Sequence, residues 1–181
     1  LKALRAGIDP KDPAAAEALC AETNIAVEMG PAGQKTLLDG EDVSNLIRTP
    51  EVGAAASAVS TVKAVRRRMV ALQQACAAKA DMVVDGRDIG TVVLPNATCK
   101  FFLTASPEVR ARRRFLEMQQ KGAACSYEEI LKGVIDRDYQ DMHREADPLR
   151  QADDARVIDS SDMTLDETVQ AILNVIREVL A

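Results

Sequence analysis

The sequence predicts an α/β fold in which a mostly parallel sheet is flanked by helices and carries a small antiparallel β insert. First, apolar runs short enough for buried strands occur at residues 82–85, 99–103 and 155–160, and each leads into polar residues. Second, helical patterns separate these runs, as expected for parallel strands joined by right-handed crossovers. Third, β-like runs flank glycine-rich turns within residues 24–44.

Residues 1–21 predict two small packing helices. Asp12 is a suitable N-cap, and Pro13 takes the first helical position, where its missing N–H costs nothing. The second helix is therefore expected to begin at Pro13.

The antiparallel unit is expected within residues 24–44. Strands at residues 25–28 and 35–38 flank a Gly-Pro-Ala-Gly turn, and a second turn is expected at Asp39–Gly40.

The pair Thr49–Pro50 repeats the cap-then-proline signal and opens an alanine-rich helical stretch. Within it, Ser57 and Arg66 lie nine residues apart, so an unbroken helix would place them on opposite sides. The β-branched, serine-containing residues 59–62 are the expected place for a break that would let them share a site.

A capped helix in the second half of the chain carries several arginines. Ser106 and Pro107 open it, and Arg110, Arg113 and Arg114 share one of its faces. A solvated basic face and a clamp for a polyphosphate both fit this pattern.

The next helix is expected to carry a charged row. Ser126 and Glu129 form a capping-box pattern at its start, and Arg137, Asp141 and Arg144 follow at intervals of four and three. Both an intrahelical salt-bridge ladder and a ligand-binding face fit this spacing.

The last predicted elements are a strand at residues 155–160 and an amphipathic helix. Asp147–Pro148 should end the preceding helix, and Thr164 with Glu167 predicts a capping box for the last one. The residues of this helix expected to face inward are Val169, Ile172, Leu173, Ile176, Val179 and Leu180.

The stretch from residue 82 to residue 95 is the one around which the chain is organised. A strand that ends in Asp85–Gly86 would deliver Arg87 and Asp88 at the carboxyl edge of the sheet, where open α/β sheets bind ligands. Arg87 offers a donor fork suited to phosphate, and Asp88 offers a pair of acceptors. The alternative is a strand-end turn with a structural Arg–Asp ion pair.

Composition limits the function classes. A net charge of −5 argues against a general nucleic-acid or membrane binder. Four scattered cysteines and one histidine, without a C-x-x-C pair, make a zinc site improbable, and we expect no metal-ligating residues. Scattered thiols, with no signal peptide or membrane-spanning run in the sequence, lead us to expect a cytoplasmic location.

Taken together, several motifs resemble those of bacterial cytidylate kinases, and the resemblance covers essentially the whole chain. The most specific are the R-T-P-E-V run at residues 48–52 and the G-R-D-I-G-T-V-V run at residues 86–93. The others are G-E-D-V-S at residues 40–44, R-x-x-R-R at residues 110–114 and R-D-x-x-D at residues 137–141.

The resemblance implies a single domain over residues 1–181 with the P-loop nucleoside monophosphate kinase fold. It implies a monophosphate-binding insert over about residues 24–79 and a lid over about residues 106–148. The implied reaction transfers the γ-phosphoryl group of ATP, with Mg²⁺, to CMP or dCMP, giving CDP or dCDP. The implied partners are these small nucleotides, and the implied state is a monomer that binds no nucleic acid.

Carried over residue by residue, the resemblance assigns roles to ten side chains. Cytosine would be read by Ser57, Arg66 and Asp88; the CMP phosphate would be held by Arg87 and Arg144, the sugar by Arg137 and Asp141, and ATP would face Arg110, Arg113 and Arg114. Of these, the implied catalytic residues are Arg87, Arg113, Arg137 and Arg144.

One departure from the family is large. The family opens with a strand and a Walker A loop, G-x-x-x-x-G-K-[ST], and this pattern occurs nowhere in the sequence. We therefore expect the fold to lack its first strand and the 181-residue chain to have little or no kinase activity by itself. The expected explanation is an incomplete chain from a complete enzyme.

Two alternatives stay open. The chain can be a truncated nucleotide-binding module that holds CMP without turnover, or one that takes its Walker A segment from a second chain. A nucleic-acid binder that uses the arginines at residues 66–68 and 112–114 is disfavoured by the negative net charge and by the lack of interleaved aromatic residues.

Overall fold

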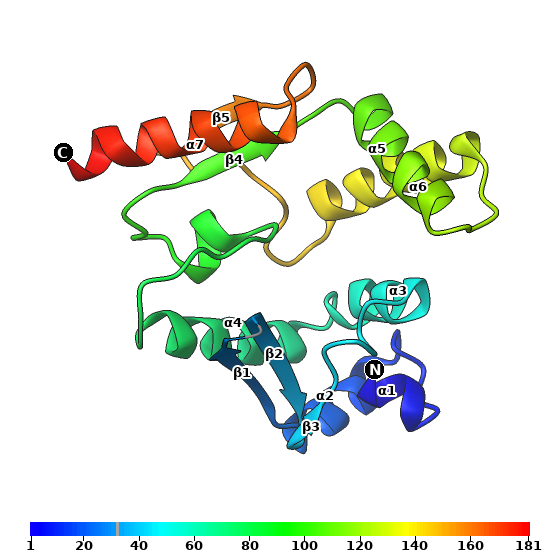
Figure 1. Ribbon diagram of the computed structural model, residues 1–181. Coiled ribbons are helices and arrows are strands. Elements are labelled where there is room, and N and C mark those ends of the chain that lie inside the picture. Colours follow the sequence, from blue (N-terminus) through cyan, green and yellow to red (C-terminus); the bar gives the residue numbers. More distant parts are fainter. Residues whose placement is uncertain (32) are drawn as a thin grey trace. The chain divides into compact units, whose positions relative to one another are not determined.

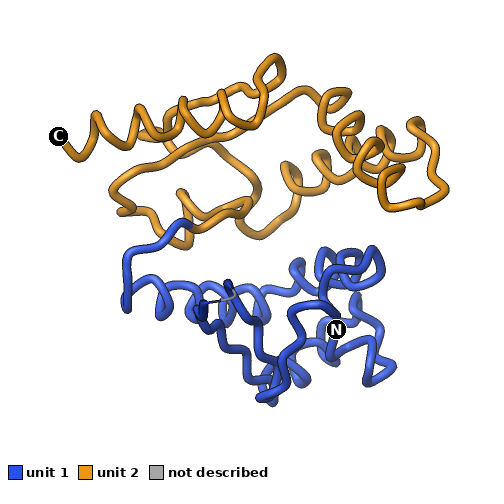
Figure 2. Tube along the Cα trace, viewed as in Figure 1, with its two compact units in different colours: residues 1–83 blue, residues 84–181 orange. Residues whose placement is uncertain are grey.

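The structure is a computed structural model that describes residues 1–31 and 33–181. The chain divides into two compact units, Leu1–Val83 and Val84–Ala181 (Figure 2). Residue 32, which belongs to the predicted Gly-Pro-Ala-Gly turn, lies outside the described residues. No helix in the described ranges is both long and apolar enough to cross a lipid bilayer.

The first unit joins helices to a small antiparallel sheet (Figure 1). Its elements are α1 (Lys2–Arg5), α2 (Pro13–Ala21), β1 (Ile25–Gly30), β2 (Gly33–Leu38), β3 (Glu41–Asp42), α3 (Pro50–Val59) and α4 (Lys63–Ala77). The sheet order is β1-β2-β3, with Leu38 opposite both Ile25 and Glu41. The predicted antiparallel unit is confirmed, as is its second turn, where Asp39 and Gly40 have φ of 52° and 89°.

The predicted caps of α2 and α3 form hydrogen bonds. Asp12 Oδ1 accepts the N–H groups of Ala14 and Ala15 at 3.0 and 3.2 Å. Thr49 Oγ1 accepts the N–H of Val52 at 3.3 Å. Each cap satisfies donors that the first turn of a helix would otherwise leave unpaired.

The predicted break between Ser57 and Arg66 is also confirmed, because residues 60–62 separate α3 from α4. The break is held in the core of the unit: Val62 and Val65 are buried against Ala16 of α2. The chain therefore changes direction at a packed position rather than in an exposed loop.

The second unit contains a parallel pair of strands with two helices between them in sequence, a short π-helical segment before them and one helix after them. Its elements are a π-helical segment (Ile89–Val93), β4 (Phe101–Thr104), α5 (Pro107–Gln120), α6 (Tyr127–His143), β5 (Arg156–Asp159) and α7 (Leu165–Leu180). Strands β4 and β5 are parallel, with Phe101 opposite Arg156 and Thr104 opposite Asp159. Figure 1 shows α7 lying along this strand pair. The predicted α/β class, with a parallel sheet and a separate antiparallel insert, is confirmed.

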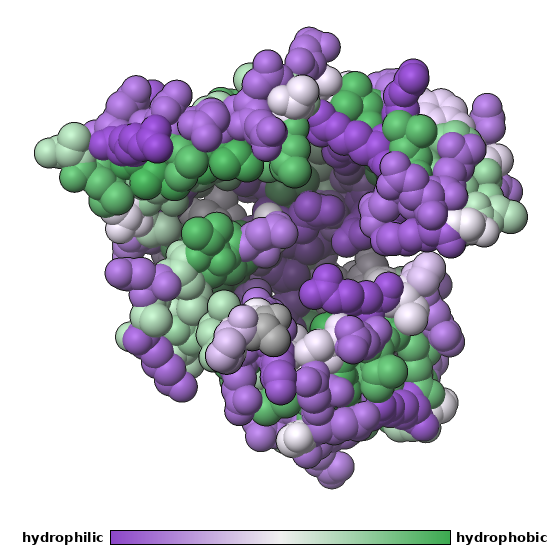
Figure 3. All heavy atoms as spheres, viewed as in Figure 1, coloured by the Kyte–Doolittle hydropathy of each residue, from purple (hydrophilic) through white to green (hydrophobic). Residues whose placement is uncertain are grey.

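Helix α7 is amphipathic as predicted, although its apolar face is only partly covered. In Figure 3 polar side chains line one side of the helix and apolar side chains line the other. Ile172 and Ile176 are half-buried. Val169, Val179 and Leu180, which were expected to face inward, are 42%, 47% and 69% exposed. A periodic pattern gives the direction of a face, but only a neighbouring element can bury it.

The prediction of a buried strand at residues 82–85 is wrong for the described chain. These residues pair with no described strand, and Met82 and Val83 are 46% and 97% exposed. In the β4–β5 pair, Leu103 and Val157 are each 54% exposed, so these strands are only partly buried. An apolar run shows that burial would be favourable, whereas a strand also needs a hydrogen-bonded neighbour.

The capping box of α7 is complete and allows a stability test. Thr164 Oγ1 accepts the N–H of Glu167 at 3.2 Å, and the Glu167 carboxylate accepts the N–H of Thr164 at 2.8 Å. We expect Thr164→Ala to lower the free energy of unfolding by about 1 kcal/mol, because the N-cap acceptor is lost. Urea denaturation followed by circular dichroism measures this. The matched control is Thr98→Ala, at an exposed loop position; equal losses in both variants would contradict the role of the cap.

Candidate functional site

The turn at residues 85–88 presents two adjacent side chains of opposite charge. Gly86 allows a close approach, because a Cβ added there would lie 2.8 Å from Cγ1 of Ile89. The carbonyl of Asp88 accepts the N–H groups of Val92 and Val93 at 2.9 and 3.2 Å, so the π-helical segment starts on this residue. The backbone of Asp88 is thereby fixed from its C-terminal side.

Arg87 pairs with helix α6. Its Nε donates to Oδ2 of Asp141 at 2.8 Å, and the Asp141 side chain is only 13% exposed. Arg137, one helical turn before Asp141, lies farther from the same oxygen, at 3.9 Å. The main partner of Asp141 is therefore Arg87 and not its neighbour in the predicted intrahelical ladder.

Asp88 pairs with the residue that follows α6. Oδ1 of Asp88 lies 3.6 Å from Nη2 of Arg144, and the two side chains are 12% and 11% exposed. The Nε of Arg144 donates to the carbonyl of Asp147 at 2.7 Å, which further orients the guanidinium. Arg87 and Asp88 thus each meet an opposite charge at the C-terminal end of α6.

The expectation that Arg144 stands on the helix face with Arg137 and Asp141 is corrected by the structure. Helix α6 ends at His143, and Arg144 has an extended backbone, with φ of −61° and ψ of 142°. Pro148 and the positive φ of 48° at Asp147 would stop the helix by residue 147, but it already ends at His143, and the Arg144 side chain instead donates to the carbonyl of Asp147.

Within the second unit the structure therefore brings together five of the ten predicted side chains. They are Arg87, Asp88, Arg137, Asp141 and Arg144. Three guanidinium groups against two carboxylates leave an excess of positive charge, which suits a phosphate, while the carboxylates can accept hydrogen bonds from hydroxyl or amino groups. Among the described residues, no cluster of three His, Cys, Asp or Glu side chains is arranged to hold a metal ion.

Arg110 links α5 to α6. Its two Nη groups donate to the two carboxylate oxygens of Asp138 at 2.8 and 2.5 Å, and its Nε donates to the carbonyl of Ala105 at 2.9 Å. The bond to Asp138 raises the pKa of Arg110 above its ordinary value. All three nitrogen positions of this guanidinium are therefore used within the protein.

Arg113 binds the segment that follows β5. Its Nη2 donates to the carbonyls of Ser160 and Met163 at 2.6 and 3.1 Å, and its Nη1 donates to Oγ of Ser160 at 3.2 Å. The Ser160 hydroxyl in turn donates to the carbonyl of Thr104 at 3.1 Å. Arg114, one position along α5, is exposed.

Ser57 and Arg66 belong to the first unit. Ser57 is half-buried on α3, and Arg66 is buried on α4, with 9% of its surface exposed. Because Asp88 lies in the other unit, the expectation that these three side chains read one base stays a prediction.

The sequence reasoning assigned no role to Asp138, although a signal was available. Asp138 lies four residues after Val134 and so continues the apolar stripe that α6 turns toward its neighbour. A carboxylate on such a face requires a partner, and an arginine on α5 supplies it. The carbonyl acceptors of Ser160 and Asp147 carry no such signal, because every residue has one.

The chain is similar to known proteins over nearly its whole length. A family model described as cytidylate kinase matches residues 1–178. The cytidylate kinase of Caldicellulosiruptor bescii is 45% identical over 180 residues, which cover 99% of this chain and 80% of the relative. The cytidylate kinase of Geobacter sulfurreducens is 44% identical, covering 98% and 76%, and that of Mycolicibacterium paratuberculosis is 48% identical, covering 98% and 78%.

The Arg110–Asp138 pair can be tested by a double-mutant cycle. We expect Arg110→Ala and Asp138→Ala to show a coupling energy of about 1 kcal/mol in urea denaturation, at the upper end for partly exposed pairs, because the contact is bidentate. The control Arg112→Ala changes an exposed arginine of the same helix and should alter stability by less than about 0.5 kcal/mol. Additive effects of the two substitutions would exclude an energetic link between α5 and α6 through this pair.

Proposed function

The chain belongs to the cytidylate kinase family, and we propose that it supplies the pyrimidine-nucleotide site and the lid of an enzyme that phosphorylates CMP or dCMP. The reaction transfers the γ-phosphoryl group of ATP and gives CDP or dCDP. The observation that supports the proposal is the pairing of adjacent Arg87 and Asp88 with Asp141 and Arg144, because guanidinium groups that would suit a phosphate then lie beside a carboxylate that would accept from a base.

Asp88 is proposed to recognise the base, together with Ser57 and Arg66 of the first unit. Cytosine presents a donor at N4 and acceptors at N3 and O2, so a carboxylate and a guanidinium complement it. Uracil reverses the pattern at N3 and position 4, which would leave buried groups unpaired. Discrimination against uracil is therefore expected to come from this carboxylate.

Arg87 and Arg144 are proposed to hold the CMP phosphate, and Arg137 with Asp141 to meet the sugar. The Nε of Arg87 donates to Asp141, and the two Nη groups of Arg87 are the donors proposed for phosphate. Phosphoryl transfer depends mainly on positioning and on neutralising charge on the phosphoryl oxygens, which these guanidinium groups provide. No side chain has to act as a strong base.

The lid arginines are proposed to face ATP, which enters as its magnesium complex. Arg113 is the one proposed to act in catalysis, with Arg110 and Arg114 contributing binding. Arg110 and Arg113 both hold protein groups in this structure, so meeting ATP would require them to exchange those partners. Arg114 is exposed and would need no exchange.

We further propose that the protein is monomeric and cytoplasmic. The proposed location rests on the four free cysteines among the described residues.

A non-catalytic module that holds CMP without turnover is the second candidate. The observation that favours it is the lack of a G-x-x-x-x-G-K-[ST] pattern in the 181 residues. The backbone donors, the lysine and the hydroxyl of that loop bind the ATP phosphates and Mg²⁺ in kinases of this kind. A polypeptide of these residues alone is therefore proposed to bind CMP with little or no phosphoryl transfer.

Two measurements on one purified sample of known intact mass test the proposal. Calorimetric titration with CMP measures binding, and a coupled assay with ATP, Mg²⁺ and CMP measures ADP release. Binding with CMP-dependent ADP release supports the kinase, and binding without release supports the second candidate. A protein that neither binds CMP nor releases ADP would overturn both.

Asp88→Ala tests base recognition. We expect CMP affinity to fall about 10- to 100-fold, because a charged acceptor for the cytosine amino group is lost, while ATP affinity changes less than about twofold. Calorimetric titration with each nucleotide measures both. The control Asp136→Ala removes an exposed aspartate of α6 and should change neither affinity. Equal losses for CMP and ATP would remove Asp88 from the base-reading role.

A further inference from the structure

Lys100, immediately before β4, has a nearly buried ammonium group. Its side chain is 8% exposed, and its Nζ donates to the carbonyl of Pro95 at 2.5 Å and to the carboxylate of Asp154 at 2.8 Å. The backbone carbonyl of Lys100 accepts the N–H of Arg156 at 2.9 Å. One residue therefore joins the chain after the π-helical segment, the start of β4 and the loop before β5.

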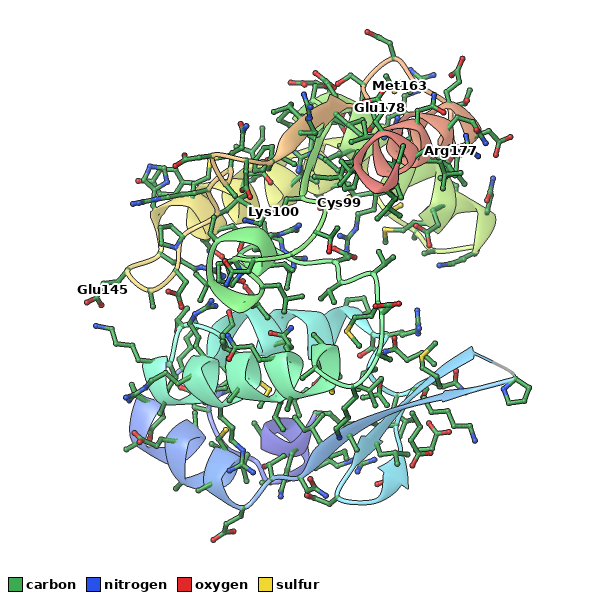
Figure 4. The ribbon with its side chains drawn as sticks, turned by 90° about the vertical axis from the view of Figure 1, so that its left-hand side faces the viewer. Cys99, Lys100, Glu145, Met163, Arg177 and Glu178 are labelled. Carbon is green, nitrogen blue, oxygen red and sulfur yellow. The ribbon has the colours of Figure 1, made fainter. Side chains whose placement is uncertain are left out.

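The carbon stem of Lys100 also lies against the π-helical segment. A Cβ added at Gly90 would lie 3.4 Å from Cδ and 3.8 Å from Cγ of Lys100, and 3.7 Å from Cβ of Ala152. Figure 4 labels Lys100 beside this short helical segment. The segment is thus held at Gly90 by packing, and the chain just after it is held at Pro95 by a hydrogen bond.

This segment determines where Asp88 stands. The N–H groups of Val92 and Val93 donate to the Asp88 carbonyl, and the N–H of Leu94 donates to the carbonyl of Ile89 at 2.7 Å. A shift of the segment would move Asp88 and, with it, the carboxylate that lies 3.6 Å from Arg144. The route proposed from Lys100 to Asp88 is the hydrogen-bonded backbone of this segment.

The energetics favour a role in placement over a role in bulk stability. Asp154 is 64% exposed but Lys100 is only 8% exposed, so the cost of desolvating the ammonium group offsets much of the attraction between the two charges. Burying an ammonium group is costly unless it is hydrogen-bonded, and here the carbonyl and the carboxylate both accept from it. The same bond holds the pKa of Asp154 below its ordinary value. A buried lysine that contributes little stability but joins three segments is suited to fixing geometry.

We propose that Lys100 is a positioning residue for base discrimination: it touches no nucleotide, but by fixing the segment from Ile89 to Pro95 it sets the orientation in which Asp88 meets the pyrimidine. The inference rests on the proposed function of Asp88. It adds a specificity determinant that follows the π-helical segment in sequence, whereas Asp88 precedes that segment.

The test compares Lys100→Met with the control Lys11→Met. Methionine keeps an unbranched stem of similar length and removes the charge without leaving a buried unpaired ammonium. Lys11 is exposed. Calorimetric titrations with CMP and UMP give the ratio of the two affinities. We expect this ratio to fall about tenfold in Lys100→Met, because only CMP gains from a well-placed Asp88, and to stay unchanged in Lys11→Met.

A second measurement needs no nucleotide. We expect the amides of Val92, Val93 and Leu94 to exchange their hydrogens about tenfold faster in Lys100→Met, with unchanged protection of the amides in α7. Asp154→Asn should give an intermediate change, since it weakens one of the two Nζ contacts, and it serves if the methionine variant does not fold.

The outcomes distinguish a failure of the proposed function of Asp88 from a failure of the proposed role of Lys100. A wild-type protein that binds CMP and UMP equally would overturn the proposed function of Asp88 together with this inference. A wild type that prefers CMP, with Lys100 variants that keep both the affinity ratio and the local amide protection, would overturn only the role of Lys100. A fall in melting temperature with an unchanged ratio would show a merely structural lysine.

Discussion

The second unit depends on two ion pairs that join a turn to the end of a helix. Arg87 and Asp88 are adjacent and opposite in charge, and each finds its complement within four residues at the end of α6, Asp141 for Arg87 and Arg144 for Asp88. Two such pairs fix a rotation as well as a distance, because a slip would bring like charges together. The end of α6 is thereby specified by electrostatics, since no residue of α6 is fully buried.

Helix α6 is also held by α5, through the pair of Arg110 and Asp138. Arg110 joins Asp138 to the end of β4, and Arg113 joins α5 to the segment after β5. Helix α6 therefore receives its position from the sheet through α5 and from the turn through Arg87. An arginine network of this kind can place a weakly buried helix where apolar packing alone leaves it loosely specified, since each bidentate contact fixes a direction.

Local rules predicted local structure well. The caps at Asp12, Thr49 and Thr164 and the break at residues 59–62 depend on a few neighbouring residues, so the sequence carries them. The apolar run at residues 82–85 failed because strand formation needs a partner far away in sequence. Helical spacing placed Arg144 in α6, whereas the helix ends at His143 and Arg144 has an extended backbone. The backbone acceptors of Arg113 and the partners of Lys100 are brought close by tertiary folding, so no local residue pattern predicts them.

The pairs around Arg87 and Arg144 also bear on how a phosphate would bind. Immobilising a long side chain costs about 0.5–1.5 kcal/mol, and a carboxylate partner already meets part of that cost before an anion arrives. The partner repels the anion as well, so the arrangement helps only if cations exceed carboxylates. Arg137 lies 3.9 Å from an oxygen to which Arg87 donates at 2.8 Å, so it supplies that excess and is the less closely held of the two guanidinium groups at Asp141. Pre-organisation and net positive charge are thus provided by different arginines of one cluster.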